Sequence, residues 1–358
     1  MKKKSNTLLI SLISVLFGFI LGIIVVFLTG KNPLDMIYAI IKSMTGYDIT
    51  RPARGVFIVY PLNWLNESLP IILTGLSVAF AYRTGLFNIG AEGQYMIGTM
   101  AASVVALWVK LPPIIHPIVI VLTAALAGAL WGAIPGILKA YRKINEVVIC
   151  IMLNYIAMHF VSYIVKYVLP LDPNSGSRTI DFPASSLIPK LNFGTTSFFN
   201  YSFIFIIIGL IIFHIIIEKT TFGFSLRATG FNQEGARYAG MNVNRNIVLS
   251  MMISGAFAGL AGGIVILGSY GYGRMFSHFD NYGFDGISVA LVGAANSIGV
   301  FFSGLLFGLL KSSTNNLQIS RIPKEISDLI QAAIIFGVSI QYFFIVIKNK
   351  FFNKKGAK

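Results

Sequence analysis

The chain has 358 residues, of which 55% are hydrophobic and only 11% charged, and its mean hydropathy is +0.76. This composition excludes an ordinary soluble domain and indicates an all-α integral membrane protein, a single transmembrane domain over residues 1–358. The net charge of +15 does not indicate a nucleic-acid partner, because the basic residues cluster at the ends of apolar segments. The single cysteine, Cys150, excludes an internal disulfide.

The amino-terminal apolar run extends from Leu8 to Leu28 and follows three lysines. A cleaved signal peptide is the alternative, but its apolar core would be shorter and would be followed by small residues at a cleavage site. Residues 27–31 offer no such site, so we expect an uncleaved first helix. Residues 30–65 contain three prolines and read as a connector with room for a short surface helix.

Nine further apolar segments bring the expected number of membrane helices to about ten. The predicted helices cover residues 66–82, 90–109, 114–138, 145–168, 201–217, 248–268, 284–298, 299–313 and 324–347. A proline-rich loop at 169–200 separates a first half, 1–168, from a second half, 201–347. A polar segment at 218–247 interrupts the second half, and a basic tail occupies 348–358.

Basic residues exceed acidic ones in both tails and in the loops near 139–146 and 218–247. Such an excess belongs on the cytoplasmic side of a membrane. We therefore expect a multi-pass protein with both termini in the cytoplasm and the loop at 169–200 outside.

Residues 85–98 read Gly-Leu-Phe-Asn-Ile-Gly-Ala-Glu-Gly-Gln-Tyr-Met-Ile-Gly and place polar side chains between two apolar segments. Their glycines permit tight bends and close backbone approach. Polar groups at membrane depth are costly, so they tend to line a cavity or to satisfy broken backbone. A glycine-rich turn between two membrane helices is the alternative interpretation.

The run Gly-Leu-Phe-Asn-Ile-Gly-Ala-Glu-Gly-Gln, together with Leu-Thr-Gly-Leu-Ser-Val-Ala-Phe at 73–80, resembles the signature of permease subunits of bacterial ABC importers. The resemblance covers roughly residues 60–345 and lies within the ribose and branched-chain amino-acid permease superfamily. It is greatest to the branch that takes up nucleosides with a lipoprotein receptor of the basic-membrane-protein type.

This resemblance implies a permease subunit in the bacterial plasma membrane, without a cofactor of its own. It implies four partners besides the lipid bilayer: a second homologous permease, a cytoplasmic ATPase with two nucleotide-binding halves, an extracellular substrate-binding lipoprotein and the nucleoside. ATP and Mg²⁺ would be used by the ATPase.

The helices predicted at 90–109 and 284–298 share several features. Each follows a glycine-broken segment, each carries one acid near its start, and the two enter the membrane from opposite sides. Paired glycine-interrupted spans in corresponding positions of inverted halves indicate a transport site. We therefore expect an inverted five-helix repeat with broken helices near the midplane.

The segment at 221–240 contains the elements of a short surface helix. Gly230 is expected to break the chain, Asn232 can cap a helix running to about Ala239, and Gly240 can end it. A solvated loop with ordinary cytoplasmic arginines is the alternative. In the resembled permeases this region couples to the ATPase, which implies coupling roles for Arg227, Gly230, Glu234, Ala236, Arg237 and Gly240.

A nucleoside has a flat base and a neutral sugar, so its path should combine aromatic faces with amide or carboxylate groups. Seven residues of suitable type lie in suitable segments: Phe87, Asn88, Glu92, Gln94, Asn154, Tyr155 and Asp285. For Glu92 and Asp285 a structural alternative is strong, because each acid can cap the broken helix beside it.

No Walker phosphate loop, paired metal-ligand motif or nucleophile elbow is present, so we expect a transport subunit and not an enzyme. An ion-driven secondary transporter also uses inverted repeats and broken helices, but it has no need of a docking helix. A ribose-type sugar permease or an amino-acid permease remains open, since nothing in the residues distinguishes a ribose from a ribonucleoside.

Overall fold

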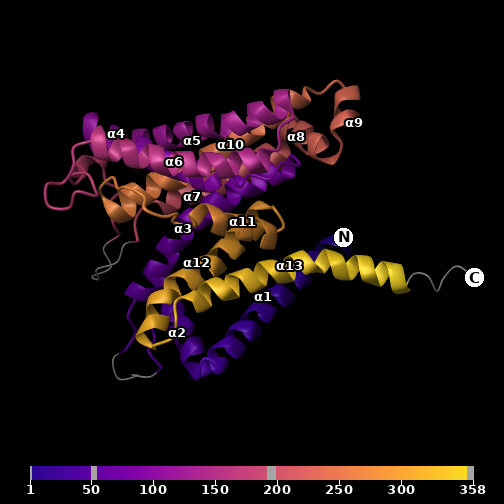
Figure 1. Ribbon diagram of the computed structural model, residues 1–358, viewed down its shortest axis with the longest axis horizontal. Helices are drawn as coiled ribbons and strands as arrows, with labels where there is room; N and C mark the ends of the chain where they lie inside the picture. The colour runs from indigo at the N-terminus through magenta and orange to yellow at the C-terminus, as the bar shows by residue number, and fades with distance from the viewer. Residues whose placement is uncertain (1, 50–54, 192–198, 353–358) are drawn as a thin grey trace, which may run out of the picture.

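The computed structural model describes residues 2–49, 55–191 and 199–352 and is built from helices (Figure 1). They are α1 (Lys2–Leu28), α2 (Pro33–Thr45), α3 (Val59–Arg83), α4 (Ala91–Trp108), α5 (Ile115–Arg142), α6 (Glu146–Tyr167), α7 (Phe203–His214), α8 (Thr221–Phe231), α9 (Gln233–Tyr238), α10 (Val243–Val265), α11 (Tyr282–Val292), α12 (Ser297–Ile319) and α13 (Glu325–Phe352). Within these residues extended chain forms only isolated bridges, so the all-helical expectation is confirmed.

Six helices of the described chain are long and apolar enough to cross a membrane: α1, α3, α5, α6, α12, and α10 with its π-helical extension to Tyr270. A seventh span results if α7 and α8, which meet at a bend of 72°, are counted together. The 11 residues of α11 extend only about 16 Å, too short to cross a bilayer alone. The apolar helices agree with a multi-pass membrane protein.

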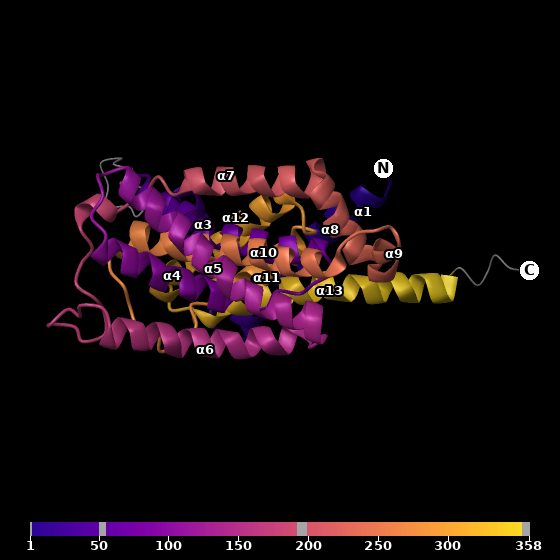
Figure 2. The ribbon, with the colours of Figure 1, turned by 90° about the horizontal axis from the view of Figure 1, so that it is seen from above.

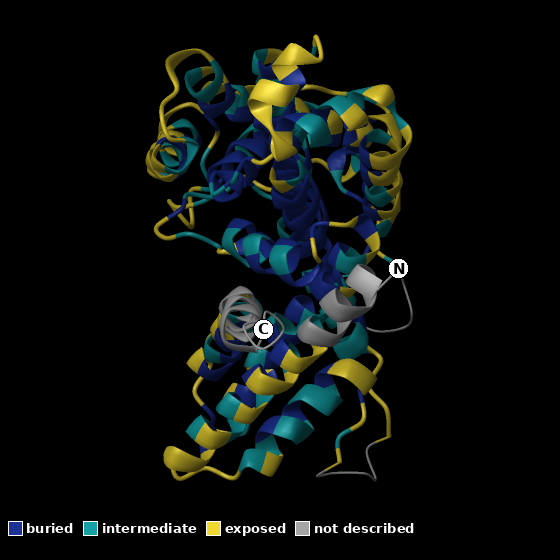
Figure 3. Ribbon diagram, turned by 90° about the vertical axis from the view of Figure 1, so that its right-hand side faces the viewer, coloured by how far each residue is buried: buried dark blue, intermediate teal, exposed yellow. Residues whose placement is uncertain are grey.

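The helices form two groups. Helices α4, α5, α6 and α10 lie on one side in Figure 1, and α1, α2, α12 and α13 lie on the other, with α3 and α11 between them. The loop between α6 and α7 lies at one end, whereas α8, α9, the start of α1 and the end of α13 lie at the other (Figures 1 and 2). Buried residues are most frequent along α3 and α10, and Figure 3 shows that they lie in the interior of the molecule.

Small residues bring α5 and α10 into backbone contact. A Cβ atom built on Gly255 would overlap the carbonyl oxygen of Gly128, and one on Gly259 would overlap that of Ala124. The glycines spaced four apart on α10 therefore permit the close helix approach that their pattern predicts. Two residues of the 85–98 segment pack against this helix pair: Gly98 lies against Gly259 of α10, and Gln94 lies against Gly132 of α5.

Residues 30–65 hold α2, in agreement with the short helix allowed for there, but α3 begins already at Val59 and not at residue 66. Other predicted boundaries are also wrong, and caps explain two of them. Helix α10 begins at Val243 because Asn242 accepts a hydrogen bond from Arg245 N. The turn between α11 and α12 falls at 293–296 and not at Gly299, because Asn296 caps α12 by accepting from Gly299 N. Helix α13 continues through the first residues of the predicted basic tail, while 192–198 and 353–358 lie outside the described residues.

Candidate functional site

The polar residues of the signature segment form a closed network between α3, α4 and α10. Asn88 Nδ2 donates to Gln94 Oε1 at 2.8 Å and to Ser254 Oγ at 2.7 Å, and Gln94 Nε2 donates back to Asn88 Oδ1 at 3.2 Å. Ser254 Oγ donates in turn to the Ser77 carbonyl oxygen. Asn88 and Gln94 are 0% and 1% exposed. Their hydrogen-bonding capacity is used inside the chain.

Asn154 attaches the signature turn to α6. Its Oδ1 accepts from Gly93 N at 2.8 Å and its Nδ2 donates to the Ile89 carbonyl oxygen at 3.0 Å. A Cβ on Gly93 would lie only 3.0 Å from Asn154 Cα, so this position has no room for a side chain. The predicted close backbone approach is thus present here, and Asn154 satisfies backbone groups that the turn leaves free.

Glu92 joins the beginnings of α4 and α11. It lies in the first turn of α4 and is 0% exposed. Its Oε1 accepts from Asn281 N at 3.0 Å and its Oε2 from Gly283 N at 2.6 Å, which are N–H groups at the start of α11. Free N–H groups at a helix start favour a negative charge. The carboxylate therefore caps α11, and not the helix on which it lies.

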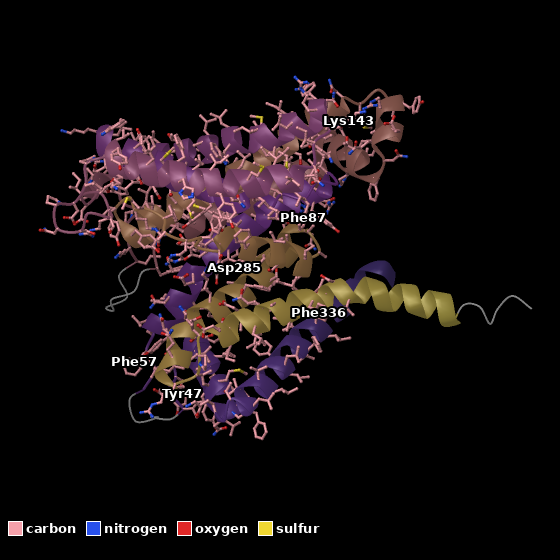
Figure 4. The ribbon with its side chains drawn as sticks, in the orientation of Figure 1. Tyr47, Phe57, Phe87, Lys143, Asp285 and Phe336 are labelled. Atoms are coloured by element: carbon pink, nitrogen blue, oxygen red, sulfur yellow. The ribbon has the colours of Figure 1, made fainter. Side chains whose placement is uncertain are left out.

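Asp285 forms an ion pair with a lysine that the sequence analysis missed. Lys311 Nζ on α12 lies 2.9 Å from Asp285 Oδ2, and it also donates to the Asp280 carbonyl oxygen at 3.1 Å. The same ammonium lies 3.8 Å from the centroid of the Tyr282 ring. Figure 4 shows Asp285 about midway along the helices, between the two groups. The sequence alone could have singled out Lys311, because a charged residue inside an apolar helix is costly in a membrane and therefore indicates a functional site.

Aromatic rings extend from α6 to the start of α11. Tyr155 is 52% exposed and makes an edge-to-face contact with Phe279, with 5.0 Å between ring centroids. Phe279 contacts Phe284 in the same manner at 5.7 Å, and Phe284 immediately precedes Asp285. We call Tyr155, Phe279, Phe284, Asp285 and Lys311 the aromatic–acid face.

Of the seven candidate path residues, the structure thus brings Tyr155 and Asp285 together on a partly exposed face. Four others, Asn88, Glu92, Gln94 and Asn154, are buried and bonded within the chain. Phe87 is half-buried and lies nearer the end that carries α8 and α9 (Figure 4). No group of three His, Cys, Asp or Glu residues suited to a metal ion occurs in the described part of the chain.

The segment at 221–240 forms two short helices at the end of the molecule where the termini lie. Asn232 Oδ1 accepts from Gly235 N at 3.0 Å and caps α9, and Gly240 ends the segment with φ +78°, as predicted. The prediction that Gly230 breaks the chain is wrong, since α8 continues to Phe231. Gly230 instead permits α8 to approach the backbone at the end of α3, because a Cβ there would lie 2.8 Å from Arg83 O and from Gly85 N.

The outward surface of this segment carries two large aromatic rings. Phe231 and Tyr238, at the ends of α8 and α9, are each 92% exposed. Ala236 is 4% exposed and belongs to a small core cluster with Leu86 and Val243, so a large residue there would first disturb the seat of α9. Ala236 therefore faces this core cluster and not the outer surface, and the coupling role implied for it stays a prediction.

The charged residues of the segment divide into two pairs. Arg237 lies 3.3 Å from Glu234 on α9, with both side chains more than half exposed. Arg227 on α8 instead contacts Glu218, which lies before the bend.

A family model described as branched-chain amino acid transport system / permease component matches residues 60–339. The chain is 41% identical over 359 residues to the guanosine ABC transporter permease protein NupP of Bacillus subtilis, with all of both chains covered. It is 34% identical to the nucleoside ABC transporter permease protein NupB of Lactococcus lactis subsp. cremoris, covering 98% of this chain and 95% of that one. It is 29% identical to the glucose ABC transporter permease protein TsgB13 of Haloferax volcanii, covering 78% and 76%. No solved structure matches.

Replacing Glu92 by Gln tests the cap on α11. An amide offers one acceptor and turns its NH₂ group toward an N–H donor, so one buried N–H loses its partner at a cost of about 1–3 kcal/mol. We expect a lower thermal unfolding temperature of the purified protein in detergent. Glu325→Gln is the matched control, because Glu325 is an exposed acid in the first turn of α13. Equal unfolding temperatures for the two variants would contradict the capping role.

Proposed function

The chain belongs to the family of branched-chain amino acid transport permease components, and from this premise we propose that it is the membrane subunit of an ATP-binding cassette importer for nucleosides. As a permease component it is a transport subunit and not an enzyme. The assignment of a nucleoside as the substrate rests on the full-length similarity to a guanosine permease. A sugar is the second candidate, because a glucose permease is also similar over most of the chain. Family membership sets aside the ion-driven secondary transporter.

In the proposed architecture the chain crosses the membrane in ten segments that form two inverted groups of five. Nine of them are α1, α3, α4, α5, α6, α10, α12, α13 and α7 with its π-helical extension to Lys219. The tenth is the short α11, which would cross together with the connecting segment that precedes it. The inverted repeat is supported by the meeting of α4 and α11 at their N-termini, with an acid in the first turn of each, Glu92 and Asp285. Broken helices that meet in this way are typical of transport sites near the midplane.

The aromatic–acid face is the proposed substrate path. Aromatic rings such as Phe279 and Tyr155 can stack on a base of any identity, while the Asp285–Lys311 pair can bind sugar hydroxyls. Asp285 lies at about half the length of the helices (Figure 4), and the rings are linked to it through the contact of Phe279 with Phe284. A second homologous permease would close the open side of this face. The buried signature residues would hold the path in shape and not contact the nucleoside.

The segment from Arg227 to Gly240 is the proposed docking element for the cytoplasmic ATPase, which uses ATP and Mg²⁺ through two nucleotide-binding halves. Phe231 and Tyr238 are large exposed rings of the kind that anchor protein interfaces. The lipoprotein receptor would deliver the nucleoside at the opposite end, where the α6–α7 loop lies. The protein would lie in the bacterial plasma membrane with both termini in the cytoplasm.

Cysteine labelling tests this topology. In a Cys150→Ser background, Ser175→Cys on the exposed α6–α7 loop should react with a membrane-impermeant maleimide added to intact cells. Tyr238→Cys on α9 should react only after the membrane is permeabilised, because α9 is proposed to be cytoplasmic. The reverse pattern would exclude the proposed orientation.

Uptake measurements test the proposed path. Replacing Phe279 by Ala removes a stacking surface worth about 1–3 kcal/mol per base, so ATP-dependent uptake of radiolabelled guanosine at limiting concentration should fall about tenfold. Tyr163→Ala is the matched control, since Tyr163 is an exposed ring on α6 that contacts Tyr167 and not the aromatic–acid face. If the two variants transport equally, the path lies elsewhere.

Removing the two exposed rings tests ATPase docking. The double variant Phe231→Ala, Tyr238→Ala should reach the membrane normally but bind the ATPase about thirtyfold more weakly, as expected for the loss of about 2 kcal/mol at anchor residues. Tyr141→Ala, an exposed ring at the end of α5, is the control. Co-purification measures the association and liposome uptake measures transport. Import by the double variant on an ion gradient without ATP would contradict the importer.

A further inference from the structure

Glu218 lies at the bend that leads into the docking element. It belongs to the π-helical segment Ile215–Lys219, which follows α7 and meets α8 at 72°. Its two carboxylate oxygens bind different arginines: Oε1 accepts from Arg83 Nη2 and Oε2 from Arg227 Nη1, each at 2.5 Å. We call Arg83, Glu218 and Arg227 the Glu218 triad. It ties the end of α3 to α8 across the bend.

The backbones of α8 and the signature turn also touch. Gly85 has φ +74°, and a Cβ there would lie 3.0 Å from Gly230 Cα. On the neighbouring α10, Ser250 Oγ donates to Thr84 Oγ1 at 2.8 Å. Residues 83–85 are therefore held between α8 and α10. A displacement of α8 must be transmitted to them unless the triad breaks.

Arg83 extends this connection to the far end of α11. Its Nη1 donates to the Ala295 carbonyl oxygen at 3.4 Å, in the turn between α11 and α12. Ala294 and Ala295 have φ values of +51° and +49°, so this turn has a defined and unusual backbone. The other end of α11 is held by Glu92 and precedes Asp285. The triad thus links the docking element to the helix that carries the acid of the proposed path.

We propose that Glu218 is a positioning residue that makes α8, the end of α3 and the α11–α12 turn move together when the ATPase acts on the docking element. This inference rests on the proposed function. The triad side chains are 23–34% exposed, so their attraction adds little to stability. Their value is geometric, because one carboxylate holds two guanidinium groups that come from separate helices.

The experiment measures transport and ATP hydrolysis in the same liposomes, with the complete complex, its receptor and radiolabelled guanosine. Glu218→Gln keeps the shape of the side chain and removes its charge. We expect the guanosine imported per ATP hydrolysed to fall about fivefold or more, the low end of measured coupling effects, while the ATPase stays bound. Glu218→Asp should recover part of the ratio. Glu146→Gln, which breaks the Lys139–Glu146 pair between α5 and α6, is the matched control and should keep it.

The arginine variants and the following outcomes test the role of Glu218 further. Arg83→Gln and Arg227→Gln act through the same carboxylate, so the double variant should lower the ratio no more than the stronger single variant. Additive losses, or a Glu218→Gln complex with a wild-type ratio, would overturn the inference and leave the importer intact. A variant that only unfolds at lower temperature, with a normal ratio in the remaining protein, would also overturn it. Failure of the wild-type complex to import guanosine with ATP would overturn the proposed function and this inference together.

Discussion

The carboxylate of Glu92 supplies two acceptors to a helix that begins among other helices. In an apolar interior no water can bind the first N–H groups of α11, so Asn281 N and Gly283 N need partners from the chain. One buried carboxylate satisfies both and places its negative charge where a helix start favours it. The contact is so close that a Cβ on Gly283 would overlap the backbone of Glu92. The starts of α4 and α11 are thereby fixed to each other, and the proposed path is built on this joint.

The signature segment works as a structural joint because its polar groups are satisfied internally. Asn88 and Gln94 bond to each other, and Asn88 also donates to Ser77 of α3 and Ser254 of α10. Asn154 accepts from and donates to backbone groups of the turn. A substrate would have to break these buried bonds before it could use the same groups, and each unmade bond costs free energy. The residues that carry the resemblance to importer permeases are therefore better suited to holding helices than to contacting a nucleoside. In the proposed importer, contact would fall to Tyr155 and Asp285, whose side chains are partly exposed.

The sequence predicts the long apolar helices and both ends of α9, because hydrophobic runs, Asn caps and positive-φ glycines act within a few residues. The caps at Asn242 and Asn296 were missed. Asn232 and Gly240 were placed correctly from their neighbours alone. Interactions between distant segments were not predictable in the same way. Nothing local indicates that Gly230 faces Gly85, that Ala236 is buried, or that Lys311 pairs with Asp285, since each depends on how helices pack. Phe279 was missed because it lies in a connecting segment, where an aromatic residue carries no periodic signal.

The chemistry of the aromatic–acid face suits weak, transient binding along a path better than tight binding at one site. Asp285 and Lys311 already bind each other, so a sugar hydroxyl gains a partner there only by competing with an existing ion pair. The rings of Phe279 and Phe284 are likewise in edge-to-face contact with each other and only half-buried, which leaves part of their surface for stacking. Conduction requires binding strong enough for a substrate to enter and weak enough for it to leave. In the proposed importer the receptor would therefore provide the affinity, and this face would provide a sequence of weak contacts through which the nucleoside passes.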